Sequence, residues 1–567
     1  MTTTGADLFT AALEQYGVSY LFGNPGTTEL PIMYTLGDSD LEYVLAAHED
    51  IAVGMAAGYA KTRVHHAHDD PGINPVGVVN LHIGPGVAHG LGNVFDSSLV
   101  GTGAPLVVTA GAHPTDHAFH EPNLGADLVR MTDQFTKWSA EVTNVNALPT
   151  MLRRAFRVAL TPPTGPTFLA LPFDVMTAET DATPERLGEI PNAGEGDSAA
   201  IDRAADRIAA AEEPVLVVGD LVSRAGPDAV AAAGRLADAA GMRAHGEFKA
   251  SEVAFPTDHE GWFGRLPRDQ ALAAELLDTD LVAFVGVVSN TTTNPPELEH
   301  VPSTATTVHV SNYAWELGKN HVADLALLGD PGSVMERLAD RVAERVSAEE
   351  RESRFETIAR TRRRLGAETT AEGENGGGNG NGSDPRASDA ELAAALHAAA
   401  PDARIVAEAP TSAGALRDVW DFEPGQYVAN RGGGLGYGLP AAIGSAIAER
   451  DREDPTDVLA LIGDGSYLYY PQSLYTAARY DIDLTVVVPD NRNYRILKDN
   501  TLRLFGGEET EYDFVGMDFE PPVDLAANAV SHGASGRLVE DPAEIEAAVA
   551  AAVAEPGPTV LDVLTHD

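Results

Sequence analysis

The sequence of 567 residues contains no cysteine. Without thiols, the chain can form neither disulfides nor cysteine-ligated zinc or iron–sulfur sites. It also has no apolar run approaching ~18 residues, so we predict no membrane-spanning helix. The first residues show no basic segment followed by an apolar one, which argues against a signal peptide. We therefore expect a cytoplasmic protein with no membrane partner.

Positive charge is also scarce. Lysine and arginine together number 38 against 85 acidic residues, which gives a formal net charge of −47. Such a charge repels phosphate backbones, so we expect no nucleic-acid partner. The basic residues include only five lysines: Lys61, Lys137, Lys249, Lys319 and Lys498.

The acidic residues are spread along the chain and not gathered in a tail. Acid excess with few lysines indicates a halophilic protein, because at molar salt the Debye length falls to about 3 Å and self-repulsion is screened. An acidic partner-binding surface is the alternative interpretation.

Short valine-rich strands alternate with alanine-rich helical stretches along the whole chain. Continuous apolar strands between helices are typical of parallel sheets covered on both faces. The pattern predicts an α/β protein with three doubly wound domains over 1–176, 200–345 and 388–567. A linker is predicted over 346–387, rich in glycine and asparagine from 372 and flexible up to 386. Ser388 and Glu391 form a capping-box pattern that opens the helix after it. The expected strands cover 76–80, 106–110, 167–171, 215–219, 281–286, 307–310, 404–407, 458–462, 484–488 and 559–563.

The clearest motif follows the strand at 458–462 and reads Gly-Asp-Gly-Ser over 463–466. Asn491 comes 27 positions after Asp464, at the end of the next predicted strand. Ligands of such folds bind at the carboxyl ends of the strands. A carboxylate and an amide oxygen there suit Mg²⁺, and the glycines let backbone N–H groups approach a diphosphate.

This motif resembles that of the thiamine-diphosphate-dependent enzymes, in which Gly-Asp-Gly precedes Asn-Asn by some 25–30 residues. The resemblance implies three domains, namely a pyrimidine-binding, a middle Rossmann-like and a diphosphate-binding domain. It implies Mg²⁺ ligands at Asp464, Asn491 and the carbonyl of Asn493. The residues implied to bind the cofactor are Glu49, Thr411, Ser412, Gly433, Leu435, Asp464, Gly465, Ser466, Asn491 and Tyr494, with Leu435 wedged between its two rings. The first asparagine of the family motif is Asp490 here, which places an extra carboxylate near the metal.

Glu49 lies in the segment His48-Glu49 followed by Gly-Met-Ala over 54–56 and Gly-Tyr-Ala over 58–60. In the family this pattern carries the acid that activates the cofactor. The resemblance implies that the Glu49 carboxyl hydrogen-bonds the pyrimidine ring and promotes loss of the thiazolium C2 proton.

Further segments, at 23–31, 80–82 and 255–259, resemble benzoylformate decarboxylase and its acetolactate-synthase-like paralogues. The resemblance implies active-site histidines at His82 and His259, which carry protons near neutrality. It places Thr27 where the decarboxylase branch has serine. The added methyl group would reshape the carboxylate pocket, so the resemblance does not identify the substrate.

Two other histidine groups do not enter this assignment. His65, His66 and His68 suggest a metal cluster, but we interpret them as part of an acidic surface insertion. His113, His117 and His120 either border the substrate entrance or belong to a surface loop.

Thiamine-diphosphate- and Mg²⁺-dependent decarboxylation of a 2-oxo acid, with carboligase activity beside it, is the function that the resemblance favours. An acetolactate-synthase-like carboligase acting on pyruvate is the alternative, although most such enzymes lack a histidine at His82. A cofactor-binding paralogue without activity is the third. We expect no FAD. The family geometry implies a homodimer or homotetramer with the active site at the subunit interface.

Overall fold

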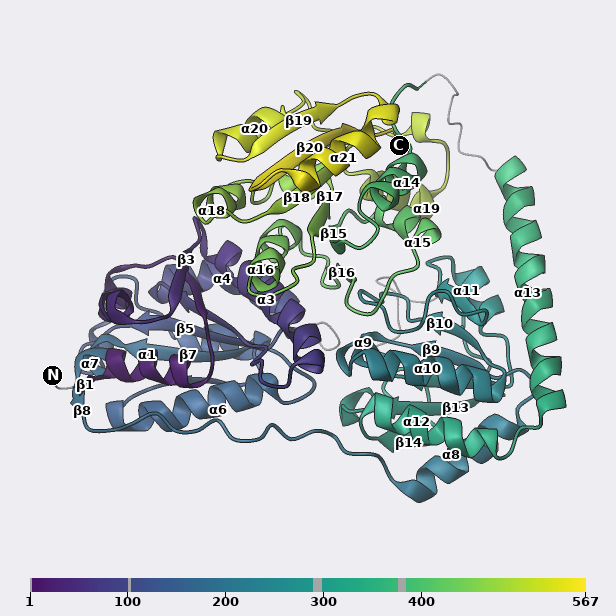
Figure 1. The fold of residues 1–567 in the computed structure, drawn as a ribbon, viewed down its shortest axis with the longest axis horizontal. Coiled ribbons are helices and arrows are strands. Elements are labelled where there is room, and N and C mark those ends of the chain that lie inside the picture. Colours follow the sequence, from purple (N-terminus) through teal and green to yellow (C-terminus); the bar gives the residue numbers. More distant parts are fainter. Residues whose placement is uncertain (1–2, 100–102, 289–297, 376–383, 567) are drawn as a thin grey trace.

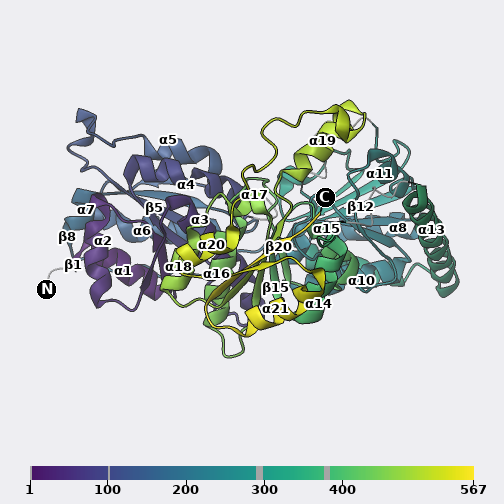
Figure 2. The same cartoon turned by 90° about the horizontal axis from the view of Figure 1, so that it is seen from above.

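The structure of the protein, a computed structural model, describes residues 3–99, 103–288, 298–375 and 384–566. It contains three six-stranded sheets, and all neighbouring strands within each of them run parallel (Figures 1 and 2). Helices cover these sheets, so the predicted fold of three doubly wound α/β domains is confirmed.

The N-terminal and C-terminal sheets share one strand order, and the middle sheet has a different one. In the N-terminal domain the order is β3-β2-β4-β5-β7-β6, in the middle domain β11-β10-β9-β12-β13-β14, and in the C-terminal domain β16-β15-β17-β18-β20-β19. Each expected strand overlaps an observed one. The strands are β1 (Thr3–Thr4), β2 (Tyr20–Gly23), β3 (Glu42–Leu45), β4 (Gly77–Leu81), β5 (Leu106–Ala112), β6 (Ser139–Glu141), β7 (Thr167–Pro172), β8 (Glu179–Thr180), β9 (Val215–Val218), β10 (Arg243–Gly246), β11 (Trp262–Arg265), β12 (Leu281–Val285), β13 (Thr306–Ser311), β14 (Leu325–Leu328), β15 (Arg404–Glu408), β16 (Tyr427–Ala429), β17 (Val458–Ile462), β18 (Leu484–Asp490), β19 (Ser535–Val539) and β20 (Pro558–Leu564).

The helices follow the strands in the alternation that the sequence predicts. They are α1 (Gly5–Gln15), α2 (Leu30–Thr35), α3 (Glu49–Asp69), α4 (Ile83–Ser98), α5 (Leu128–Thr132), α6 (Leu148–Leu160), α7 (Phe173–Thr177), α8 (Ser198–Ala210), α9 (Asp220–Arg224), α10 (Pro227–Ala240), α11 (Gln270–Leu276), α12 (Pro331–Ala343), α13 (Ala348–Asn375), α14 (Asp389–Ala399), α15 (Ala413–Val419), α16 (Gly438–Arg450), α17 (Asp464–Tyr467), α18 (Ser473–Arg479), α19 (Arg495–Phe505), α20 (Leu525–Ser531) and α21 (Ile545–Ala554).

The segment predicted as a linker is largely helical. Helix α13 runs along the side of the molecule from the middle domain toward the C-terminal domain (Figure 1). Its arginine side chains fix its start, since Arg354 donates to the backbone carbonyls of Ala240 and Ala211. Residues 376–383 of the glycine-rich stretch lie outside the described residues, and the domain boundaries stay a prediction. The capping box is confirmed, because the Glu391 N–H donates to Ser388 Oγ and the Ser388 N–H to Glu391 Oε2.

Helices α3 and α16 join the N-terminal and C-terminal domains within one chain. Their backbones come so close that a Cβ atom at Gly58 would lie 1.9 Å from the Ala441 carbonyl oxygen. A Cβ atom at Gly444 would lie 1.8 Å from the Met55 carbonyl oxygen. Small residues at these positions therefore permit the contact, and the buried residues of both domains form one continuous core.

The interpretation of His65 and His66 as surface residues was wrong. Both side chains lie on α3 and are buried at the junction of the domains. The His66 ring contacts the Glu449 carboxylate of α16 at 3.0 Å, and His65 lies 3.5 Å from the Glu252 carboxylate of the middle domain. The adjacent acids come from distant parts of the chain, so the local sequence did not reveal this pairing.

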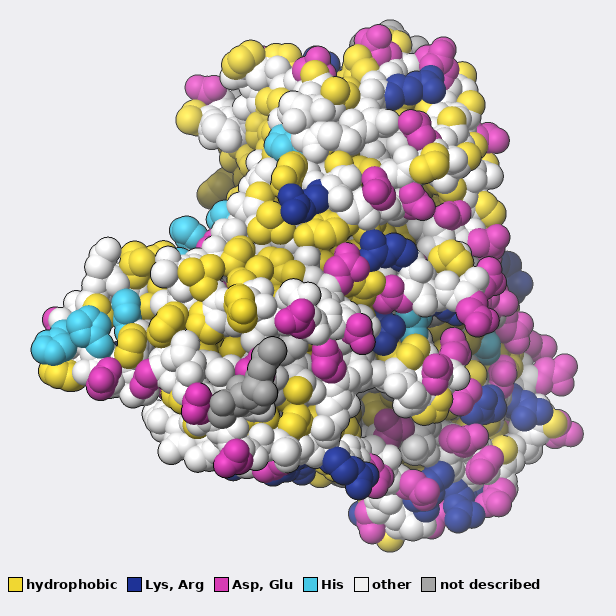
Figure 3. Space-filling view, turned by 60° about the vertical axis from the view of Figure 1, so that its left-hand side comes forward, with side chains coloured by type: hydrophobic (Ala, Val, Ile, Leu, Met, Phe, Trp, Pro, Cys, Tyr) yellow, Lys and Arg dark blue, Asp and Glu magenta, His cyan; other side chains and the backbone are white. Residues whose placement is uncertain are grey.

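The surface differs between regions. Figure 3 shows hydrophobic side chains gathered in the central part of one face, while acidic side chains are dense at its right-hand and lower-right side. Large exposed apolar residues include Tyr34 and Phe119 of the N-terminal domain and Tyr475 and Val530 of the C-terminal domain. No helix in the described ranges is both long and apolar enough to cross a membrane.

Candidate active site

The predicted metal residues lie at the carboxyl ends of two neighbouring strands of the C-terminal sheet. Asp464 follows β17 and begins α17, and Asn491 follows β18. These strands pair directly, with Leu461 opposite Val487. The Asn491 side-chain oxygen accepts from the Asn493 N–H at 3.2 Å, so a tight turn holds both asparagines. The parallel sheet thus brings together the residues that the spacing predicts.

The electrostatics of this turn favour a cation. Asp464 is buried, its Oδ1 accepts from the Gly465 N–H at 2.8 Å, and its Oδ2 has no hydrogen-bond partner. Burial, followed by the neighbouring Asp490 carboxylate, raises the pKa of Asp464 to about 7. Burial and Asp490 also raise the pKa of Asp562, on β20, to about 7. Asp464, Asp490 and Asp562 are three buried carboxyls, and two of their oxygens, Asp464 Oδ2 and Asp562 Oδ1, have no hydrogen-bond partner. Such a group suits a divalent ion, which would neutralise the charge and supply a missing partner.

The departure from the family motif therefore adds charge at this turn. Asp490 is buried, and its Oδ1 accepts from the Arg492 N–H at 3.1 Å. The Arg492 side chain lies 3.7 Å away and partly balances it.

The residue after Asp464 is a glycine packed closely against a tyrosine ring. A Cβ atom at Gly465 would lie 2.4 Å from the ring of Tyr494, so only glycine fits beneath this tyrosine. Ser466 is buried in the first turn of α17. On the neighbouring strand, Thr411 and Ser412 follow β15 directly before α15. These residues provide backbone N–H groups and hydroxyls at one edge of the sheet, as a diphosphate requires.

A buried glutamate holds the glycine-rich loop at 431–438. Glu408, the last residue of β15, accepts from the Gly436 N–H at 2.8 Å and from the Gly438 N–H. Burial raises its pKa to about 8. The loop places Gly433, with φ +77°, and Leu435 on the wall of a large cavity. The role of Leu435 as a wedge against a bound cofactor stays a prediction.

Glu49 begins α3 in the N-terminal domain and is buried. Its carboxylate contacts His89 Nδ1 of α4 at 3.2 Å and accepts from the Asn24 side chain at 3.5 Å. The ring of His48 stacks on that of His89, with centroids 5.1 Å apart. The side chain of Glu49 is thus buried and held in position by His89 and Asn24.

His82 lies beside Glu49 at the carboxyl end of β4. A Cβ atom at Gly86 of α4 would approach both, at 2.9 Å from Glu49 Oε1 and 3.0 Å from His82 Cβ. His82 Nδ1 contacts the buried Glu29 carboxylate at 2.9 Å. Glu29 also accepts from the N–H groups of Gly26 and Gly111, at 2.9 and 3.0 Å. Glu29 therefore fixes the ring of His82.

The other two predicted catalytic residues differ in their positions. Thr27 is followed by Thr28, whose hydroxyl lies 3.4 Å from His82 Nδ1. Thr27 is exposed and lines a shallow apolar depression with Tyr34 and Phe173. His259 lies in the middle domain, where Nε2 contacts Asp238 of α10 at 3.1 Å and Nδ1 accepts from the Gly261 N–H at 2.8 Å. Within one chain, none of the described contacts of His259 involves Glu49 or His82. Its catalytic role stays a prediction.

No hydrogen bond or ion pair between described residues joins Glu49 to Asp464 or Asn491 within one chain. Among the described residues, the side chain of Glu49 bonds only to N-terminal partners. The domains do meet nearby, since the Tyr470 hydroxyl donates to Asp50 Oδ2 at 3.0 Å. The structure thus forms one half-site with Glu49 and His82 and another with Asp464 and Asn491.

Three sheets of this topology and two such half-sites define a class of protein that binds a diphosphate cofactor between unlike domains. Three family models confirm the class: Thiamine pyrophosphate enzyme N-terminal TPP binding domain over 3–131, central domain over 201–338, and C-terminal TPP binding domain over 411–563. The chain belongs to the thiamine pyrophosphate (thiamine diphosphate) enzyme family.

Individual relatives do not identify one reaction within this family. The chain is 30% identical to "Benzoylformate decarboxylase" of Pseudomonas aeruginosa, with 98% of this chain and 97% of the relative aligned. It is 25% identical to "Probable acetolactate synthase large subunit" of Methanocaldococcus jannaschii, covering 99% and 91%. A solved thiamine diphosphate-dependent 4-hydroxybenzoylformate decarboxylase of Rhodococcus jostii superposes with a TM-score of 0.82 at 28% identity, over 100% and 99% of the chains. The relatives thus include both decarboxylases and acetolactate synthases.

Sequence reasoning missed several residues of these half-sites. Glu29 and Glu408 lie in or beside segments in which other residues, such as Thr27, Thr411 and Ser412, were predicted to act. An acid next to an apolar strand or segment was the available signal for both. Nothing in the sequence indicated His89 or Asp562. Each becomes relevant only through a residue on another element, Glu49 for His89 and Asp490 for Asp562.

Proposed function

We propose that the protein is a thiamine-diphosphate- and Mg²⁺-dependent decarboxylase of a 2-oxo acid. The observation that carries this proposal is that Glu49 and His82 both lie next to Gly86, with His82 held by the buried Glu29. A fixed imidazole beside the activating acid gives a proton donor and acceptor next to the reacting carbon. The acetolactate-synthase-like branch mostly lacks a histidine at this position.

Each half-site has a separate task. Asp464, Asn491 and the Asn493 carbonyl would hold Mg²⁺, and the N–H groups of Gly465 and Ser466 would bind the diphosphate. Bound thiamine diphosphate supplies the electron sink for cleaving the bond between a 2-oxo carbon and its carboxylate. Glu49 would exchange a proton with the aminopyrimidine ring, and His82 would move a proton at the substrate oxygen or carbon.

The geometry supports an oligomeric enzyme. No described contact joins Glu49 to Asp464 within one chain, and the family geometry implies a site between subunits. We therefore propose that the N-terminal half-site of one subunit meets the C-terminal half-site of another, in a homodimer or homotetramer. The exposed apolar side chains of both domains are available for such an interface.

The test is CO₂ release from benzoylformate, pyruvate and branched 2-oxo acids, with thiamine diphosphate and Mg²⁺ at high KCl. We expect release that falls at least 100-fold in Glu49→Gln with unchanged circular dichroism. Release that is unaffected by Glu49→Gln would refute the assignment.

The alternative function, acetolactate synthesis, is favoured by the similarity to acetolactate synthases over 99% of the chain. The same reactions distinguish it, because acetolactate would accumulate from pyruvate while benzoylformate stayed intact. Absence of any turnover, despite cofactor binding, would identify an inactive paralogue. Flavin absorbance of the purified protein tests for bound FAD.

A further inference from the structure

A cavity of about 570 Å³ lies between the middle and C-terminal domains. Its walls come from the segments after β10 and β11, from the end of β15, from α15 and from the loop after β16. Leu435, Gly433 and Pro410 lie on its wall, and they belong to the segments predicted to meet the cofactor. Middle-domain residues of the wall include the aromatic side chains of Phe248 and Phe263. The cavity is therefore lined both by segments predicted to meet the cofactor and by residues of the middle domain.

The charge of this cavity is opposite to that of the molecule. Five basic residues line it: Lys249, Arg265, Arg268, Arg417 and Arg431. The chain has 85 acidic and 38 basic residues, so an excess of basic residues around one cavity suggests that the cavity binds an anion.

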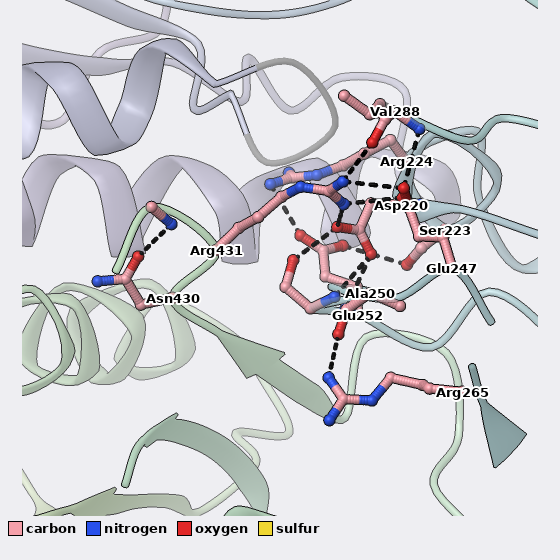
Figure 4. A network of polar contacts seen from close by, with 12 residues as sticks. Asp220, Ser223, Arg224, Glu247, Ala250, Glu252, Arg265, Val288, Asn430 and Arg431 are labelled. Carbon is pink, nitrogen blue, oxygen red and sulfur yellow. Dashed lines mark hydrogen bonds and ion pairs between the residues drawn. The ribbon is translucent and has the colours of Figure 1, made fainter. Parts of the chain in front are cut away.

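Arg431 does not supply free charge to the cavity. Its guanidinium contacts Asp220 Oδ2 at 2.9 Å and Glu247 at 2.8 Å, and it donates to the Val288 carbonyl (Figure 4). This buried group ties the glycine-rich loop to the middle domain and is neutralised there.

The four other bases have no acidic partner. In the part of the chain that the structure describes, no ion pair includes Lys249, Arg265, Arg268 or Arg417. Arg265 donates to the Ala250 carbonyl at 2.7 Å (Figure 4), and Arg417 donates to the Tyr427 hydroxyl at 3.0 Å. Burial, and then Arg417, lower the pKa of Arg265 to about 10. Burial, Arg431 and Arg268 lower the pKa of Lys249.

The acids of the cavity wall leave these bases uncompensated. Glu252 contacts Arg224 at 2.9 Å and the Ser223 hydroxyl at 3.1 Å, away from the four bases. Glu408 accepts from backbone N–H groups of the glycine-rich loop. Asp418 is exposed, and among the described residues it forms no ion pair. Adjacent cations without counter-charge are unfavourable in a free cavity and favourable around a bound anion.

We propose that this cavity binds a 2-oxo acid whose side chain ends in a second anionic group, a carboxylate or a phosphate. The reacting end lies toward Leu435, the chain passes the aromatic wall, and the distal anion is held by Arg265 with Arg268 and Lys249 nearby. This substrate class rests on the proposed function. Arginine suits the task because its planar guanidinium still has free donors after the bond to Ala250.

Binding of unreactive ligands tests the anion site without turnover. Isothermal titration at one fixed ionic strength would compare hexanoate, adipate and butyl phosphate on the full-length protein. We expect the better of the two anion-ended ligands, adipate or butyl phosphate, to bind about ten-fold more tightly than hexanoate. That ligand identifies the distal group. The preference should be lost in Arg265→Gln and reduced in Arg268→Gln, whose exposed position carries little folding risk. Arg235→Gln, which removes an exposed arginine paired with Glu336, is the matched control.

Equal binding of hexanoate and both anion-ended ligands, or a preference that survives Arg265→Gln and Arg268→Gln, would overturn the anion site. Turnover is measured separately with 2-oxohexanoate and 2-oxohexanedioate. If 2-oxohexanoate is turned over and 2-oxohexanedioate is turned over no faster, the proposed substrate class is overturned, and the proposed function is not. No CO₂ release from any 2-oxo acid overturns the proposed function, while the binding result still decides the anion site.

Discussion

The least expected residue of the site is Glu29, a fully buried carboxylate that the sequence presents only as part of a glycine- and threonine-rich turn. Two backbone N–H groups and the Thr28 hydroxyl, at 2.6 Å, satisfy it, and its remaining contact is the ring of His82. A buried carboxylate of this kind orients a histidine ring without itself contacting the substrate.

We therefore predict that Glu29→Gln lowers kcat about 10- to 100-fold, because a hydrogen bond to a charged group is worth about 1.5–3 kcal/mol. Steady-state kinetics would measure the loss, with thermal unfolding as the check on folding. If Glu29 acts through His82, the double variant Glu29→Gln/His82→Gln should be no slower than His82→Gln alone. Fully additive losses would show that Glu29 acts independently.

At the scale of elements, the contact between α3 and α16 sets the relation of the two cofactor-binding domains. Glu49 begins α3, and the glycine-rich loop leads directly into α16. The close approach of these helices at Gly58 and Gly444 therefore fixes where both half-sites lie on their own domains.

Gly58→Ala should lower the free energy of unfolding by about 1–3 kcal/mol, because the new methyl group would overlap the Ala441 carbonyl. Gly414→Ala is the matched control: this glycine lies in α15 and a Cβ atom there would meet open space. The control should gain up to about 1 kcal/mol from helix propensity. Urea titrations of both variants measure these changes, and equal effects would contradict the assigned packing.

At the scale of the whole molecule, the separation of the half-sites predicts complementation between subunits. Glu49→Gln and Asp464→Asn should each abolish activity in their own oligomers. After mixed refolding or coexpression, half of the dimers are mixed, and one of the two sites in each is intact. We therefore expect about a quarter of wild-type activity.

The control is a mixture of Glu49→Gln with His82→Gln. These two residues lie on the same half-site, so no intact site forms beyond what each variant retains. Activity that fails to return in the first mixture, although mixed oligomers are shown to form, would place the whole site within one chain.

The local sequence determined the strands, the alternation of strands and helices and the turn after β17, because hydrophobic patterning and glycine placement act over a few residues. Through resemblance to the family it also indicated Glu49, His82, Asp464 and Asn491. Only the tertiary structure decided that α13 is a helix over much of the predicted linker, that His65 and His66 are buried, and that Glu29 holds His82. It also decided that four bases, with no ion pair among the described residues, line one cavity of an acidic protein. Burial and charge pairing depend on residues far apart in the chain, so their consequences become visible only once the chain is folded.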